Sequence, residues 1–204
     1  MDNDEVTWLF HVASVLLRYP EIDESVYLDR LAYLRKKTAG QQETKGREWI
    51  LNTLDDWQQI PFITLCENYV EAFDFSEGSC LYLTAHEYGD GRARGEALVM
   101  LHNMYAVAGW QEATTELSDY LPLILEFLSL YGNDPQTTLL QLRLAKVTHR
   151  ILAHLPSRNV FRGVFHALLT VLPTVELKDE SIVFPFRESA DTDELPYPLQ
   201  HQFS

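Results

Sequence analysis

Seven histidines, two cysteines and thirty acidic residues are the side chains in this sequence that could do chemistry. The histidines form no HExxH motif, and Cys66 and Cys80 belong to neither a CxxC pair nor a Cys/His cluster, so no metal site is expected. A hydrolase nucleophile would need a turn such as GxSxG, which the sequence lacks. With so many acids, a chance pair of carboxylates does not indicate a glycosidase. These patterns predict that the protein is not an enzyme.

The glycine-rich stretch Gly89-Asp-Gly-Arg-Ala-Arg-Gly superficially suggests phosphate binding. It departs from the Walker and Rossmann patterns, and it follows a predicted helix where those loops follow a strand. The favoured interpretation is a helix start capped by Asp90, with Arg92 and Arg94 pairing with nearby acids. A nucleotide-binding helical protein is the alternative that this stretch leaves open.

The elements that would position these residues are helices, because the apolar period is helical along nearly the whole chain. Stops and caps such as Pro20, Gly109 and Asp134-Pro135 agree with that period. Helices are expected over 5–18, 24–37, 47–59, 62–73, 81–88, 92–108, 120–131, 135–155 and 160–169, with Asp119 as the cap of the seventh. The sequence therefore predicts an all-α fold: a single-domain helical bundle of roughly eight to nine helices over residues 1–173.

Composition and charge restrict the class of protein further. The 204 residues, 46% of them hydrophobic, suffice for one domain with a core. A formal net charge of -14 disfavours nucleic acids and anionic membrane surfaces; it would steer a cationic partner toward the protein, or only keep it soluble. An acidic N-terminus and the lack of a long apolar run predict neither a secretory signal nor a membrane span. The expected compartment is the cytoplasm, with both thiols reduced.

The character of the chain changes after Pro173. Residues 174–204 contain seven acids against Lys178 and Arg187, together with three prolines, and lack helical periodicity. We expect an acidic, Pro-containing C-terminal tail that is mobile or draped over the body. Its aromatic residues could lie in a binding groove, where the tail would compete with a basic peptide; they include Phe184, Phe186 and Tyr197.

Aromatic and acidic residues at helical spacing mark the segment 69–128 as a surface that could hold another polypeptide. The segment contains Tyr-x-x-x-Phe-Asp at 69–74, Leu-Tyr-Leu-Thr-x-His at 81–86, Gly-Asp-x-Arg-x-Arg-Gly at 89–95 and Glu-Leu-x-Asp-Tyr-Leu-Pro-x-x-Leu-Glu-Phe-Leu at 116–128. By these ordered elements the chain resembles the NarJ-type maturation chaperones of respiratory nitrate reductase, within the larger TorD/DmsD/NarJ-like family of molybdoenzyme chaperones. Ser118 replaces a proline of that pattern, and Tyr120 stands where a histidine is common.

The resemblance implies a cytoplasmic, all-α chaperone that is not an enzyme. It implies binding to the N-terminal peptide of a nitrate reductase catalytic subunit, which would be held open for insertion of a molybdopterin guanine dinucleotide cofactor and kept from docking early at the membrane. No cofactor would be bound stably by the chaperone itself. The alternative client is a related dimethyl sulfoxide reductase-type molybdoenzyme.

A basic, partly apolar peptide would need an apolar groove with a carboxylate rim. Large side chains for such a groove are Tyr69, Phe73, Tyr82, Tyr120, Leu121 and Phe127, and carboxylates for its rim are Asp74, Glu87, Asp119 and Glu126. Other interpretations compete: Leu121 with Leu125 and Leu128 as core, Tyr69 with Phe73 as core, and His86 as a hydrogen-bonded structural residue. The resulting set of candidate peptide-binding residues is Tyr69, Phe73, Asp74, Tyr82, His86, Asp119, Tyr120, Leu121 and Glu126.

Overall fold

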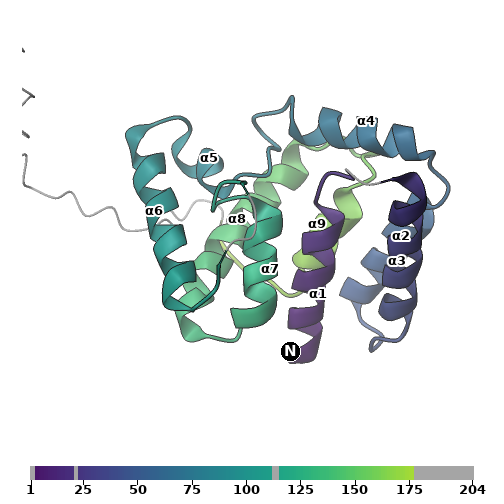
Figure 1. The fold of residues 1–204 in the computed structure, drawn as a ribbon, viewed down its shortest axis with the longest axis horizontal. Helices are drawn as coiled ribbons and strands as arrows, with labels where there is room; N and C mark the ends of the chain where they lie inside the picture. Colours follow the sequence, from purple (N-terminus) through teal and green to yellow (C-terminus); the bar gives the residue numbers. More distant parts are fainter. Residues whose placement is uncertain (1–2, 21–22, 112–114, 177–204) are drawn as a thin grey trace, which may run out of the picture.

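The computed structural model describes residues 3–20, 23–111 and 115–176. Within those ranges it has nine α-helices, one short 3-10 helix and no strand, which confirms the all-α prediction (Figure 1). The helices are α1 (Asn3–Leu16), α2 (Glu24–Ala39), α3 (Lys45–Trp57), α4 (Phe62–Phe73), α5 (Leu83–Tyr88), α6 (Arg92–Val107), α7 (Leu121–Tyr131), η1 (Pro135–Thr137), α8 (Thr138–His154) and α9 (Arg162–Leu168).

Helix α1 lies at the centre of the bundle, between α7 and α9. Because it is covered on more than one side, consecutive apolar positions are buried: Leu9, Phe10, Val12 and Ala13 are each at most 1% exposed. Helix α3 packs on α9 and α2, and the short α5 packs against both α6 and α8. Figure 1 shows α4 running across one end of these helices. The core is thus one continuous cluster, as the single-domain interpretation requires.

Some helix ends are set by residues that the sequence suggested. Asp134 caps η1 through its side chain, as predicted, and Asp23, which was not predicted as a cap, does the same for α2. Gly109 follows α6 in the left-handed conformation (φ 74°) that ends helices. Two predicted caps are wrong. The N-cap of α6 is Gly91, so Asp90 stays exposed and pairs with Arg94, and the N-cap of α7 is Tyr120, which makes no side-chain cap.

An isolated antiparallel bridge pairs Tyr82 with Tyr120 and ties together two connections that are far apart in the sequence. The Leu83 N–H donates to the Asp119 carbonyl at 2.9 Å, and the Leu121 N–H donates to the Leu81 carbonyl at 2.8 Å. The segment before α5 is therefore fixed beside the segment before α7.

The predicted boundary at residue 173 is close to the end of the described chain. Val175 still packs against the core, and residues 177–204, which hold most of the predicted acidic tail, lie outside the described residues. The tail therefore remains a prediction. None of the described helices combines the length and the apolar character that crossing a bilayer requires.

Candidate functional site

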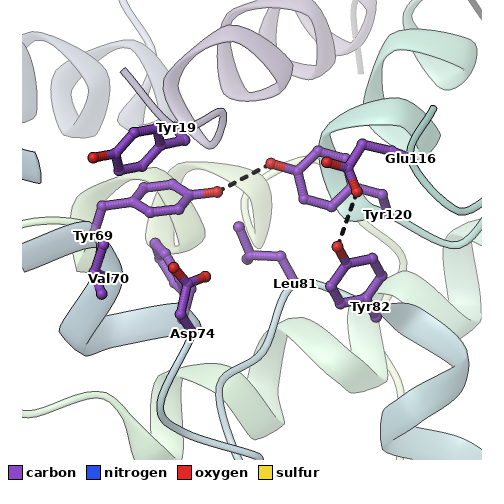
Figure 2. A pocket seen from close by; sticks show the side chains of 9 residues that line it. Tyr19, Tyr69, Val70, Asp74, Leu81, Tyr82, Glu116 and Tyr120 are labelled. Atoms are coloured by element: carbon purple, nitrogen blue, oxygen red, sulfur yellow. Dashed lines mark hydrogen bonds between the residues drawn. The ribbon is translucent and has the colours of Figure 1, made fainter. Parts of the chain in front are cut away.

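A surface hollow of about 410 Å³ opens where α4, the end of α1 and the two bridged connections meet (Figure 2). Its lining residues are Tyr19, Tyr69, Val70, Phe73, Asp74, Leu81, Tyr82, Glu116 and Tyr120. Five of the nine candidate residues are among them: Tyr69, Phe73, Asp74, Tyr82 and Tyr120. The bridge between residues 82 and 120 is what brings the two halves of the segment 69–128 to one place.

The floor of the hollow belongs to the core. Tyr69 and Phe73 stand four residues apart on α4 and so share one face of it. Both are 4% exposed, and their rings pack edge to face with centroids 4.9 Å apart. Tyr19 adds a second edge-to-face contact to Tyr69 at 5.3 Å. Both side chains therefore belong to the core and also line the hollow, and whether they contact a peptide stays a prediction.

Hydrogen bonds fix the tyrosines that line the hollow. The phenol oxygens of Tyr69 and Tyr120 lie 3.0 Å apart, and Figure 2 shows them pointing at one another above Asp74 and Leu81. The Tyr69 hydroxyl donates to the Leu17 carbonyl at 3.1 Å. The Tyr82 hydroxyl donates to Glu116 at 2.9 Å. The rings are therefore held in place before any ligand arrives.

The charged side chains that line the hollow are acidic. Among the residues that the structure describes, Asp74 and Glu116 line it, and no lysine, arginine or histidine does. Burial raises the pKa of the Asp74 carboxyl. Burial first, and then the hydrogen bond to Glu116 and its charge, raise the pKa of Tyr82. Such a site favours a cationic group over a neutral or anionic one.

Four candidate residues lie away from the hollow. Leu121 is 1% exposed in the core, as Phe127 is. His86 is buried, and its Nε2 lies 2.8 Å from the Cys80 carbonyl, to which it donates; this matches the structural interpretation. Burial lowers the pKa of His86. Glu126 forms an ion pair with Arg18.

Asp119 is fully buried and binds α5 rather than its own helix. Its Oδ2 accepts from the Thr84 N–H at 3.1 Å and from the Thr84 hydroxyl, and lies 3.9 Å from Arg94. Glu87, the remaining rim candidate, forms an ion pair with the buried Arg143. Of the four carboxylates expected at the rim, the structure brings Asp74 alone to the hollow.

Sequence reasoning missed four lining residues, Tyr19, Val70, Leu81 and Glu116. The last three lie within the ordered motifs, so the motif boundaries contained a signal for them. Tyr19 precedes Pro20 at the far end of the first helical segment, and nothing local connects it to Tyr69. Two exposed apolar residues also follow the lining carboxylates in sequence: Phe75 is 85% exposed and Leu117 is 46% exposed.

Metal-binding chemistry finds no support in the described part of the chain, where no three histidine, cysteine or acidic side chains form a cluster that could hold an ion. Cys66 and Cys80 are free thiols. The Gly89–Gly95 stretch joins α5 to α6, so it follows a helix as the sequence indicated.

Comparison with known proteins agrees with the motif pattern. The family model described as nitrate reductase delta subunit matches residues 43–156. The NarJ nitrate reductase molybdenum cofactor assembly chaperone of Bacillus subtilis (strain 168) is 29% identical over 172 residues, which is 83% of this chain and 91% of the relative. The NarJ chaperone of Escherichia coli (strain K12) is 30% identical over 125 residues, 61% of this chain but 52% of the relative, so the match spans about half of that protein.

The fold has a solved counterpart as well. A redox enzyme maturation protein from Archaeoglobus fulgidus superposes with a TM-score of 0.59 at 18% identity, covering 83% of this chain and 93% of that one. At that identity the likeness shows the fold alone. The family match includes the whole segment 69–128 and most of the hollow, and the two NarJ relatives are named as assembly chaperones rather than catalysts. The chain belongs to the nitrate reductase delta subunit family, a family of cofactor assembly chaperones and not of enzymes.

Proposed function

We propose that this protein is a cytoplasmic chaperone dedicated to a nitrate reductase catalytic subunit. It binds the N-terminal peptide of that subunit, keeps the subunit open while a molybdopterin guanine dinucleotide cofactor is inserted, and delays docking at the membrane. The cofactor is cargo for the client, and the chaperone holds none of its own. The family membership and the names of the relatives support the assembly role.

The observation that supports peptide binding is the hollow itself. It combines aromatic edges with the Asp74 and Glu116 carboxylates, and it lies in the segment that carries the family motifs. The exposed Phe75 and Leu117 adjoin those carboxylates in sequence and offer apolar area outside the hollow. A basic, amphipathic peptide presents the complementary pattern of cationic and apolar side chains.

Calorimetric titration of the full chain with the N-terminal peptide of the client subunit tests this function. Saturable binding is expected, and Phe75→Ala should weaken it about three- to tenfold through lost apolar contact. Leu130→Ala is the matched control, because Leu130 is equally an exposed apolar side chain (64%) but lies at the far end of α7. Absence of binding at high peptide concentration would falsify the proposal.

A second peptide separates the two clients. The N-terminal peptide of a dimethyl sulfoxide reductase-type subunit, titrated in the same way, should bind more weakly than the nitrate reductase peptide. Tighter binding of the second peptide would transfer the assignment to that class of client while leaving the chaperone role in place.

A further inference from the structure

Asp74 is placed where its own fold disfavours a negative charge. It is the C-cap residue of α4, and its N–H donates to the Val70 carbonyl at 3.0 Å. The carboxyl end of a helix carries partial negative charge, so an acid there is repelled. The Asp74 side chain nevertheless remains exposed at the mouth of the hollow, and partial desolvation there raises the pKa of its carboxyl.

No cation among the described residues compensates Asp74. The ion pairs of the described chain involve other acids, and the Asp74 side chain has no hydrogen-bond partner there. The charge of Arg18 acts on Tyr120 in the hollow, but Arg18 forms its ion pair with Glu126. An exposed carboxylate that lines the hollow and has no ion-pair partner is accessible to a cationic group that enters it.

The surroundings of Asp74 define the chemistry of that ligand. The hollow offers tyrosine rings from two pairs, Tyr19 with Tyr69 and Tyr82 with Tyr120, whose centroids are 5.3 and 5.5 Å apart. A guanidinium group is planar, stacks on aromatic faces and forms forked hydrogen bonds with a carboxylate. An ammonium group is more strongly hydrated and loses more on entering such a site.

We propose that the hollow takes one arginine side chain of the client peptide, with the Asp74 carboxylate as its partner and the tyrosine rings around its guanidinium plane. The inference rests on the proposed function, because it assumes that the peptide binds this face of the molecule. Glu116, already engaged by Tyr82, adds negative potential from the opposite side of the hollow.

A double-mutant cycle across the complex tests the pairing. Each arginine of the client peptide is replaced in turn by citrulline, which keeps the shape and removes the charge, and each peptide is titrated into the wild-type chain and into Asp74→Asn. One citrulline position and Asp74→Asn should each lower the affinity about tenfold, since a charged hydrogen bond is lost. Together they should lower it little further. Lysine at the same peptide position should restore only part of the affinity.

Glu67→Gln is the matched control, because Glu67 is an exposed acid on the same helix that does not line the hollow. Glu67→Gln makes the same change of charge. It should leave the affinity within about twofold of the wild-type value, because salt largely screens an exposed charge outside the hollow. The melting temperature adds a second readout. Asp74→Asn should leave it unchanged or raise it, whereas a merely structural carboxylate would lower it on removal.

The outcomes distinguish this inference from the proposed function. If the peptide binds and Asp74→Asn has no larger effect than Glu67→Gln, the arginine site is wrong and the chaperone role stands. Additive losses in the cycle, or lysine binding as well as arginine, also overturn the arginine site. Failure of every peptide to bind the wild-type chain overturns both.

Discussion

Asp74 and Glu126 are carboxylates of the same motif-bearing segment, and their neighbours give them different chemistry. Glu126 points at Arg18 and forms an ion pair with it, so its charge is already used. Asp74 lines the hollow together with the tyrosine rings, and partial desolvation raises the pKa of its carboxyl. Residue type alone would rank the two equally as partners for a basic peptide. The neighbours in the folded chain distinguish the two: Asp74 has no ion-pair partner among the described residues, so it can attract a cationic ligand more strongly than Glu126 can.

His86 supplies a prediction at the same scale, for stability against pH. Its folded-state pKa is lowered by burial from 6.5, so the unfolded chain binds the proton more tightly. The free energy of unfolding should therefore fall as the pH drops below about 6.5, until the folded-state pKa is passed. His86→Gln keeps a donor for the Cys80 carbonyl and should cost at most about 1 kcal/mol at pH 8.

The measurement is urea unfolding between pH 8 and pH 5. His86→Gln should flatten part of the decline that the wild type shows. His166, whose pKa is also lowered by burial, contributes a separate part, so its Gln variant is measured alongside. His11→Gln, at an exposed position on α1, is the control. A His86→Gln profile parallel to that of the wild type would contradict the prediction.

Helix α5 depends on other elements for its position, because six residues are too few for a stable helix in isolation. The Asp119 carboxylate holds its first turn through the N–H and hydroxyl of Thr84. At its other end, Arg150 donates to the His86 carbonyl and Arg143 pairs with Glu87. The position of Leu81 and Tyr82 in the hollow thus depends on contacts made by α7, by α8 and by the connections between helices.

Removing the Asp119 carboxylate tests that dependence. Asp119→Ala leaves two buried donors of Thr84 without their acceptor, so we expect a loss of about 2–3 kcal/mol in the free energy of unfolding. Thr84→Val should cost less, and the double variant should cost less than the sum, with a coupling of about 1–2 kcal/mol. Urea denaturation at pH 7 measures all three. Glu96→Ala, at an exposed acid on α6, is the control, and strictly additive losses would rule out the contact.

The contact between Asp119 and Thr84 shows which structural features could be predicted from the sequence and which could not. Helical periods and caps depend on residues within a few positions, which is why the α4 stripe of Tyr69 and Phe73 and the cap at Asp134 were predicted correctly. Asp119 has the local sequence pattern of an N-cap, but its carboxylate accepts hydrogen bonds from the N–H and hydroxyl of Thr84, which is 35 positions away in the sequence. The hollow could not be predicted from the sequence for the same reason. Tyr19 lines it because its ring packs on Tyr69, and no local sequence pattern indicates that contact.

At the scale of the whole molecule, the net charge of -14 acts on a basic peptide before contact is made. A field of this kind raises the rate constant of association, and salt suppresses it over a Debye length of about 8 Å at physiological ionic strength. The hollow then adds short-range attraction, which appears in the rate constant of dissociation. Charge far from the hollow and charge inside it should therefore be separable by kinetics.

Truncation after Glu176 tests the long-range part, and with it the predicted role of the acidic tail. It removes six acidic and two basic residues, which takes the formal net charge from -14 to -10, and it keeps Val175 packed on the core. If the tail only contributes charge, stopped-flow mixing with the client peptide at low salt should show association slowed about two- to threefold and dissociation unchanged. The difference should vanish near 0.5 M salt, where screening is strong. Faster association or a higher affinity after truncation would instead show that the tail competes for the hollow, through residues such as Phe184 and Tyr197.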